Sequence, residues 1–502
     1  MEKDNYSLNI LTGEKYLIPK EGDKENIDNF LSNHKGKKVI VVQGLGFVGA
    51  VMTLICSNAL TEEYAVIGVD LANSNNYWKI ASINEGIFPV VASDPKIEEY
   101  YEKTQSKGNL FATFDSYAYT IADVIIVDIN LDVLKNSDFS KTLINYDVNL
   151  KPFENAIETI GNNCKEDVLI LVETTVPPGT CKKVAYPLIK ECLLNRNLAI
   201  DKFKLGHSYE RVMPGPNYID SIQNFYRVYS GIDEKSAISV EKFLRTIIST
   251  EKYPLTQLAN TNATEMAKVL ENSYRAMNIA FMVEWSRFAE QADVNLYEVV
   301  SAIRMRPTHS NMMLPGIGVG GYCLTKDPLL ASWAKQNLFN SELPLKQSET
   351  SVQINDQMPL FAFNYLKETF KGSLKSKNVF LLGVSYRSDI SDTRYTPVEP
   401  FYDYLSSEGA RICLHDPYVD VWEEKGIEVS SDLKQLLEED IDILVFCTNH
   451  SEYINNEFLI KSISIKKNKN TFIFDTVGVL NENEINRIKE NHTLKVLGRG
   501  DL

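Results

Sequence analysis

Short runs of aliphatic and β-branched residues recur in the first and last parts of the chain. Residues 39–42 read Val-Ile-Val-Val, and the other runs are similar in character. Unbroken apolar runs of this kind are typical of strands buried on both faces of a parallel sheet. Segments with helical spacing separate them, and strands that alternate with helices predict a doubly wound α/β sheet. The predicted strands lie at residues 39–42, 64–70, 124–127 and 168–172, and again at 379–383, 410–414, 441–446 and 471–475.

The middle of the chain has a different pattern. Between about residues 263 and 303, apolar residues recur at steps of three and four with few helix breakers, which predicts one long helix or two joined helices. Long helices with this much apolar surface need a partner surface, so we expect a homodimer or a higher homo-oligomer. The predicted fold class is therefore α/β, with two Rossmann-like doubly wound parallel-sheet domains joined by a long central helical region.

The composition is that of a globular protein with an acidic surface. The 502 residues carry 52 Lys and Arg against 67 Asp and Glu, a net charge of −15. Such a surface repels phosphate backbones, so we expect no nucleic-acid partner. The seven cysteines are irregularly spaced without a CxxC pair, which indicates reduced thiols and a cytoplasmic location. The N-terminus has no apolar signal core, and no apolar run is long enough to predict a membrane span.

A glycine motif, Gly44-x-Gly46-x-x-Gly49, follows the first predicted strand. The first glycine permits a tight turn, the second lets a pyrophosphate approach the backbone, and the third allows helix and strand to pack closely. The following helix offers free N–H groups to the phosphate. Asp70 ends the next predicted strand, where a carboxylate binds both ribose hydroxyls and repels a 2′-phosphate. The motif predicts NAD rather than NADP as cofactor; the alternative is a glycine-rich turn with a solvated aspartate.

A second glycine-rich segment, residues 315–328, contains a cysteine. Its four glycines within six residues give a flexible backbone that can wrap a ligand. Cys323 follows at once, and then Lys326 and Asp327. A thiol beside a cation can act as a nucleophile, whereas the other six cysteines fit small buried side chains.

A dinucleotide loop combined with a nucleophilic cysteine predicts a four-electron oxidation. Hydride removal from an alcohol gives an aldehyde, and addition of the thiolate gives a thiohemiacetal. A second hydride transfer gives a thioester, which water hydrolyses to a carboxylate.

These features resemble the UDP-glucose/GDP-mannose dehydrogenase family, the nucleotide-sugar 6-dehydrogenases, from about Lys38 to the C-terminus. The order and spacing of the shared motifs make the resemblance specific. The matching blocks are Gly44–Gly49, Thr174–Gly179, Glu210–Gly215, Lys268-x-x-x-Asn272, Gly318–Asp327, and Gly383–Arg387 continuing to Asp392–Arg394.

The resemblance implies catalytic roles for six residues. Cys323 matches the nucleophile, and Lys268 matches the lysine that stabilises the developing oxyanion. Asn272, one helical turn beyond Lys268, would hold the sugar or the reacting oxygen. The other three are Asp327, which orders water for thioester hydrolysis, Glu210, the proposed general base, and Thr175, whose hydroxyl fixes water or cofactor.

The resemblance also implies two binding sets and no metal. Each residue taken alone has an ordinary structural alternative, such as a solvated helix face, a helix cap or a surface ion pair. The cofactor-binding set is Gly44, Gly46, Phe47, Val48, Gly49, Asp70, Lys326 and Arg394; the substrate-binding set is Arg211, Gly316, Gly318, Gly320 and Arg387.

The chain departs from the family pattern at several positions. The usual Val-Pro-Thr-Pro-like turn at the cofactor is replaced by residues 128–131, Asp-Ile-Asn-Leu. Tyr209 precedes Glu210 where the family has proline, and Tyr322 precedes the cysteine. The His-Pro-Arg of the N-acetylhexosamine branch is replaced by residues 307–309, Pro-Thr-His. The Glu210–Gly215 block nevertheless favours that branch.

The predicted function is therefore NAD-dependent oxidation of a nucleotide sugar at C6 to the uronate, for surface polysaccharide biosynthesis. A UDP-N-acetylhexosamine is the favoured substrate and UDP-glucose the second. Two alternatives remain: a non-catalytic nucleotide-sugar binding subunit, and a two-electron dehydrogenase of the hydroxyacid type. The predicted segments are an N-terminal extension (1–36, a tail or short cap), an NAD-binding domain (37–255), a central helical dimerisation region with the cysteine loop (256–370), and a C-terminal nucleotide-sugar domain (371–502).

Overall fold

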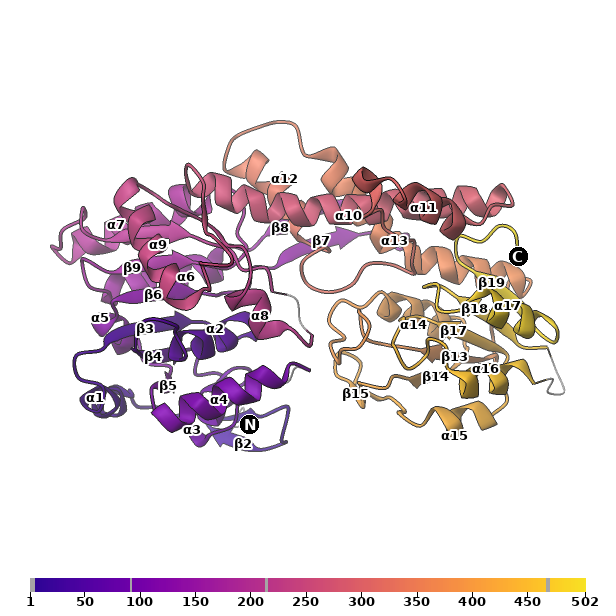
Figure 1. Cartoon of the computed structure of the whole chain (residues 1–502), viewed down its shortest axis with the longest axis horizontal. Coiled ribbons are helices and arrows are strands. Elements are labelled where there is room, and N and C mark those ends of the chain that lie inside the picture. The colour runs from indigo at the N-terminus through magenta and orange to yellow at the C-terminus, as the bar shows by residue number, and fades with distance from the viewer. Residues whose placement is uncertain (1–4, 91–92, 213–214, 466–469) are drawn as a thin grey trace. The chain divides into compact units, whose positions relative to one another are not determined.

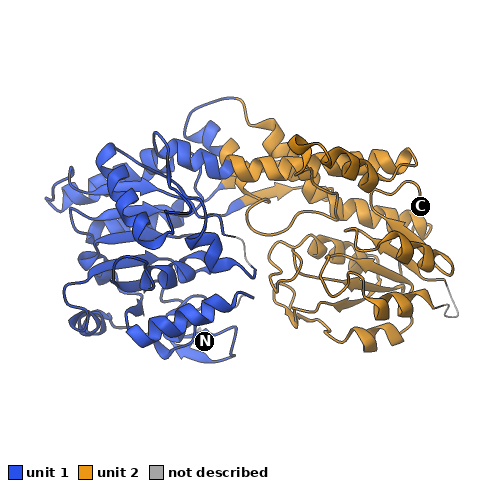
Figure 2. Cartoon of the chain, viewed as in Figure 1, with its two compact units in different colours: residues 1–133, 148–269, 333–342 blue, residues 134–147, 270–332, 343–502 orange. Residues whose placement is uncertain are grey.

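The computed structural model describes all residues except 1–4, 91–92, 213–214 and 466–469. The chain divides into two compact units that are not continuous in sequence (Figures 1 and 2). Unit 1 comprises residues 1–133, 148–269 and 333–342. Unit 2 comprises residues 134–147, 270–332 and 343–502.

Unit 1 is built on an eight-stranded sheet with the order β12-β11-β10-β9-β6-β3-β4-β5. All neighbouring strands are parallel except the antiparallel pair β10–β11. The predicted runs form its centre, and their side chains are almost entirely buried, as expected for strands covered on both faces. The strands are β3 (Lys38–Gln43), β4 (Tyr64–Val69), β5 (Leu110–Thr113), β6 (Val124–Val127), β9 (Leu169–Val172), β10 (Lys204–His207), β11 (Val228–Gly231) and β12 (Thr256–Gln257).

Helices connect these strands and bury their apolar faces against the sheet. The core of the unit includes Ile40, Val66, Leu171 and Phe243, all buried in one cluster. The helices are α2 (Phe47–Ser57), α3 (Tyr77–Glu85), α4 (Pro95–Lys107), α5 (Tyr117–Ile121), α6 (Lys151–Asn163), a π-helical turn η1 (Cys181–Ala185), α7 (Tyr186–Asn195), α8 (Tyr218–Gln223) and α9 (Glu234–Ile247).

The N-terminal extension folds onto unit 1, so of the two predicted forms it is a short cap. It forms a hairpin, β1 (Tyr6–Leu8) with β2 (Lys15–Leu17), followed by helix α1 (Lys24–Ser32). The buried Ser7 hydroxyl donates to the carbonyl of Ser74, 2.8 Å away. This contact fixes the segment that follows Asp70.

Unit 2 contains the second doubly wound sheet, which is entirely parallel and has the order β14-β13-β17-β18-β19. Its strands are β13 (Asn378–Leu382), β14 (Arg411–His415), β17 (Ile443–Phe446), β18 (Phe472–Asp475) and β19 (Thr493–Val496). Its helices are α13 (Lys346–Thr369), α14 (Val398–Ser407), α15 (Leu433–Glu438), α16 (Glu457–Ser464) and α17 (Glu482–Lys489), with a small hairpin of β15 (Val421–Trp422) and β16 (Ile427–Glu428).

The central region is two joined helices, one of the two forms that the sequence predicts. Helix α10 (Thr261–Gln291) begins in unit 1 and continues into unit 2, and α11 (Leu296–Arg304) follows after a short break. A 3₁₀ turn η2 (Pro307–His309) and the cysteine segment lead to α12 (Asp327–Asn337).

A hairpin that the sequence does not predict follows β6. Strands β7 (Val133–Ser137) and β8 (Leu143–Val148) pair, and residues 134–147 belong to unit 2. There the ammonium of Lys135 lies 2.6 Å from a carboxylate oxygen of Asp356 on α13. The chain thus continues from the carboxyl end of β6, an interior strand of the first sheet, into unit 2 and back, directly after the departure at residues 128–131.

Candidate functional site

The glycine motif forms a tight loop between β3 and α2. A Cβ atom on Gly44, whose φ is +97°, would lie 2.2 Å from the carbonyl oxygen of Asp128, and one on Gly49 would lie 1.9 Å from that of Gly44. A Cβ atom on Gly46 would meet nothing within 4 Å. The first and third glycines are therefore required by backbone packing, while the second borders open space at the N-terminus of α2. This arrangement fits a dinucleotide pyrophosphate.

Asp70 lies beside this loop at the end of β4. Its carboxylate accepts hydrogen bonds from the backbone N–H of Leu45 at 2.9 Å and of Leu71 at 2.7 Å. The Lys79 ammonium is 3.8 Å away. A carboxylate held at this position suits the ribose hydroxyls of NAD and repels the phosphate of NADP.

Buried charges lie behind the loop, and sequence reasoning did not find them as a group. The guanidinium of Arg227 donates to Glu173, and both side chains are almost fully buried. Burial, together with the neighbouring Glu173 and Glu210 carboxylates, raises the pKa of Asp128 well above its ordinary value. The segment that replaces the family's usual turn therefore carries a carboxyl group that favours its protonated form.

Lys268 and Glu210 are brought together in unit 1. The ammonium of Lys268 donates to the main-chain carbonyl of Glu210 at 3.0 Å and lies 3.5 Å from its carboxylate. Both residues are buried. The guanidinium of Arg211 lies over the rings of Tyr209 and Phe225, which hold it beside this pair. The tyrosine that replaces the family's proline thus supports the arginine.

Glu265 is a functional candidate that the sequence reasoning missed. It is fully buried on α10 and accepts hydrogen bonds from the backbone N–H groups of Gly179 at 2.5 Å and Cys181 at 2.7 Å. Burial raises its pKa to about 7. Glu265 therefore ties the segment that contains Thr175, which is partly exposed, to the helix that carries Lys268. The sequence signal that could have revealed Glu265 is its position three residues before Lys268, which places the two side chains near the same face of the helix.

Unit 2 gathers three of the other predicted residues around Asp327. The side-chain amide of Asn272 donates to the Asp327 carboxylate at 2.6 Å, and the Lys326 ammonium lies 3.2 Å from the other oxygen. The backbone N–H of Asp327 donates to the carbonyl of Cys323 at 2.9 Å. Cys323 is exposed, unlike the other six cysteines. A thiol, an amide, a cation and a carboxylate thus share one end of α12.

The glycines before Cys323 pack closely against their own unit. A Cβ atom on Gly318 would lie 2.6 Å from Pro397, and one on Gly320 would lie 2.5 Å from Tyr386. The backbone N–H of Gly321 donates to the carbonyl of Arg394 at 3.3 Å. Close packing therefore explains why Gly318 and Gly320 lack side chains. The role of Gly316, Gly318 and Gly320 in wrapping a ligand stays a prediction.

The two arginines of the C-terminal block are exposed. Arg394 forms an ion pair with Asp392 at 2.6 Å, and Arg387 lies in the segment after β13. Phe47 and Val48 begin α2, where the Phe47 ring stacks on Tyr218. The contacts of these four residues with cofactor or substrate stay predictions.

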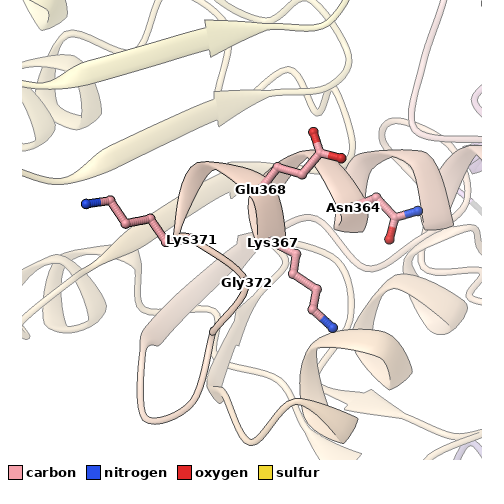
Figure 3. A pocket seen from close by; sticks show the side chains of 5 residues that line it. All are labelled: Asn364, Lys367, Glu368, Lys371 and Gly372. Carbon is pink, nitrogen blue, oxygen red and sulfur yellow. The ribbon is translucent and has the colours of Figure 1, made fainter.

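A surface hollow elsewhere in unit 2 contains none of the predicted residues. It lies at the C-terminal end of α13 (Figure 3). The ammonium of Lys367 there lies 2.6 Å from a carboxylate oxygen of Glu408. The hollow is lined by Asn364, Lys367, Glu368, Lys371 and Gly372.

Among the described residues, no helix combines the length and apolar character needed to cross a membrane.

Three family models match the chain in succession. They are the NAD binding domain (residues 38–248), the central domain (262–357) and the UDP binding domain (380–482) of the UDP-glucose/GDP-mannose dehydrogenase family. These ranges lie inside the predicted segments, whose boundaries stay predictions.

Relatives and solved structures match over almost the whole chain. A UDP-N-acetyl-D-mannosamine dehydrogenase of Methanocaldococcus jannaschii is 30% identical over 93% of this chain and 98% of its own. One of Pyrococcus horikoshii is 29% identical over 92% of this chain and 100% of its own. The structure of the P. horikoshii enzyme has a TM-score of 0.74 at 27% identity, covering 92% of this chain and 100% of that one. The structure of an NDP-N-acetyl-D-galactosaminuronic acid dehydrogenase from Methanosarcina mazei Go1 also has a TM-score of 0.74, at 25% identity, covering 95% of this chain and 98% of that one.

Proposed function

Because the chain belongs to the UDP-glucose/GDP-mannose dehydrogenase family and is an NAD-dependent nucleotide-sugar dehydrogenase of polysaccharide synthesis, we propose that it oxidises C6 of a UDP-N-acetylhexosamine to the uronate. The first candidate substrate is UDP-N-acetyl-D-mannosamine, since both relatives described above carry that name. UDP-glucose is the second candidate.

One observation carries the four-electron form of this proposal. The exposed thiol of Cys323 lies on the same short segment as Lys326 and Asp327, and Asp327 is held by Asn272. A two-electron alcohol dehydrogenase needs no nucleophile, whereas oxidation to an acid through a thioester needs a thiol nucleophile and a residue that orients water. This chain offers both on one segment.

The first half of the reaction draws on Lys268 and Glu210. A buried ammonium stabilises the alkoxide that forms at the sugar O6, and loss of a comparable oxyanion donor costs about 100- to 1,000-fold in kcat. The carbonyl and carboxylate of Glu210 hold that ammonium in place. Bound NAD⁺ supplies the hydride acceptor in each half of the reaction.

The second half draws on Cys323 and Asp327. The Sγ atom of Cys323 bonds to C6 of the aldehyde, giving a thiohemiacetal whose oxidation gives a thioester. Asp327 orients the water that attacks this thioester, and the C–S bond then breaks to release the acid and restore the thiol. Asn272 keeps one oxygen of Asp327 engaged, so that the carboxylate has a fixed orientation.

We also propose a cytoplasmic homodimer or higher homo-oligomer. On the part of α10 that belongs to unit 2, five exposed apolar residues recur at steps of three, four and seven. This face needs a partner, and seven free cysteines fit a reducing compartment. The five residues are Leu270, Tyr274, Phe281, Trp285 and Phe288, and we call them the α10 stripe.

A substrate panel tests the proposal. Purified enzyme and NAD⁺ are incubated with UDP-N-acetylmannosamine, UDP-N-acetylglucosamine, UDP-N-acetylgalactosamine, UDP-glucose or GDP-mannose, and NADH is followed by absorbance. We expect kcat/KM for one UDP-N-acetylhexosamine to exceed that for UDP-glucose by at least about tenfold, because a site that hydrogen-bonds an acetamido group rejects an analogue without it. A preference for UDP-glucose or GDP-mannose would overturn the substrate class.

A further inference from the structure

The second sheet has a point where its strand order reverses. From β13 the chain passes to β14 on one side and returns to β17 on the other, so β13 lies between them. In open parallel sheets, ligands bind outside the carboxyl ends of the strands at such a point. The segments that leave these strands are residues 383–389 after β13, Asp416 after β14, and residues 447–450 after β17.

His450 joins these three segments. Its side chain is fully buried. The Nδ1 atom lies 3.0 Å from the backbone N–H of Asp389, and the Nε2 atom lies 3.1 Å from the Asp416 carboxylate and 3.2 Å from the Ser385 hydroxyl. Because a backbone N–H can only donate, Nδ1 accepts. The ring proton is therefore on Nε2, which donates to Asp416.

The same network holds the beginning of the segment after β13. One carboxylate oxygen of Asp416 accepts from the backbone N–H groups of Val384 at 2.8 Å and Ser385 at 3.1 Å. The hydroxyl of Thr448 donates to the carbonyl of Ser385 at 2.8 Å. His450 thus fixes the end of the segment at Asp389, while Asp416 and Thr448 fix its start.

Arg387 lies between these two anchors. Its main-chain carbonyl accepts from the Ser385 hydroxyl at 2.9 Å, and the residue itself is exposed. A buried histidine therefore sets the backbone from which an exposed cation projects, within the part of the chain that matches the UDP binding domain.

The same region could also suggest a metal site, since one ligand atom each from Asp389, His450 and Glu452 lie close together. The lone pair of Nδ1 is already used by the N–H of Asp389. The Asp389 carboxylate accepts from Ser451, and the Glu452 carboxylate from the Tyr418 hydroxyl. A ligand histidine needs a free lone pair, so the geometry does not favour a metal.

We propose that His450 is a positioning residue for the nucleotide part of the substrate, which it serves by fixing the segment that carries Arg387. This proposal deepens the proposed function. It depends on that function only for the statement that the bound nucleotide is UDP. His450 touches no reacting atom, so its loss should change nucleotide affinity and leave the cofactor loop of unit 1 unaffected.

The test compares His450→Phe with Tyr453→Phe. The first keeps an aromatic ring and loses the hydrogen bonds of both ring nitrogens. The second removes a buried hydroxyl that bonds His415 at 2.8 Å and meets the segment at its first residue, Gly383, outside residues 384–389. We expect His450→Phe to weaken UDP binding, measured by calorimetry, about tenfold or more, because the partly buried N–H of Asp389 loses its acceptor and the buried Asp416 carboxylate loses a donor. The dissociation constant for NAD⁺ should change less than about twofold, and Tyr453→Phe should bind UDP nearly as the wild type does.

Hydrogen exchange separates this proposal from the proposed function. Amides of residues 384–389 should exchange faster in His450→Phe than in the wild type and in Tyr453→Phe. His450→Asn, whose amide oxygen can accept from Asp389, should restore protection of that amide. A folded His450→Phe with unchanged UDP binding and unchanged exchange would overturn the positioning role. Absence of UDP binding by the wild type would instead count against the proposed function, and the exchange result would still decide the role of His450.

Discussion

Glu265 is a single carboxylate whose environment makes a pH-dependent prediction. Its pKa is raised to about 7, chiefly by burial, while hydrogen bonds from Cys181 and Gly179 act in the opposite direction. Between about pH 5 and 7 the native chain therefore holds a proton that the unfolded chain has released. The free energy of unfolding should fall as pH rises through this window, by up to about 1.4 kcal/mol per pH unit from this group.

Glu265→Gln should lack this contribution, since an amide does not titrate. Unfolding by denaturant, measured from pH 5 to 8 for both proteins, should show a flatter pH dependence in the variant between pH 5 and 7. Parallel pH profiles for the two proteins would contradict a raised pKa at this site.

At the residue scale, motif reasoning found side chains that approach one another in the fold. Lys268 with Glu210, and Asn272 with Asp327, are 58 and 55 positions apart in sequence and are hydrogen-bonded partners. Glu265 could not be found in that way, because its partners are main-chain N–H groups. Backbone donors leave no trace in residue identity, so their partner looks like any acid on a helix.

At the scale of elements, the glycine loop allows a matched pair of substitutions. Gly46→Ala adds a methyl group to open space at an ordinary φ of −73°, so the protein should fold with its normal melting temperature. The methyl group would nevertheless occupy the position where a pyrophosphate approaches the backbone. The dissociation constant for NAD⁺ should therefore rise at least about tenfold.

Gly49→Ala should behave differently, because its methyl group would meet the carbonyl oxygen of Gly44 at 1.9 Å. We expect a loss of about 1–3 kcal/mol in the free energy of unfolding, measured by thermal or chemical denaturation. Equal stability of the two variants, or normal NAD⁺ binding by a folded Gly46→Ala, would contradict the assigned roles of these glycines.

The buried central strands were predictable because they are unbroken apolar runs. Strand β10 reads Lys-Leu-Gly-His and β19 reads Thr-Leu-Lys-Val, so neither has that signal. The β7–β8 hairpin was missed for another reason: most of its side chains are polar or exposed, and its contacts are with α13, some 200 residues later. Pairing over such a distance is set by the tertiary fold.

At the scale of the whole molecule, the α10 stripe predicts the assembly state. Wild-type protein should sediment at twice the 56.9 kDa chain mass or more. Trp285→Glu, which places a charge within the stripe, should shift the mass toward that of one chain. Leu194→Glu alters an equally exposed apolar residue on α7 and should leave the mass unchanged. A monomeric wild type, or a Trp285→Glu variant with unchanged mass, would contradict an interface on this face.

The overall architecture was accessible from sequence, since two α/β patterns flank one helical pattern. The division into two compact units was not, because α10 runs from one into the other and residues 333–342 belong to unit 1. Which unit a helix joins depends on side-chain packing over long sequence separations, and no local pattern records it.

The most direct test of the four-electron mechanism is the number of NADH molecules formed for each nucleotide sugar consumed. The account predicts two for the wild type and at most one for Cys323→Ser, because only the alcohol oxidation can proceed without the thiohemiacetal. Cys447→Ser, which alters a buried cysteine, serves as the control and should still give two. One NADH per sugar in the wild type, or two in Cys323→Ser, would contradict the mechanism.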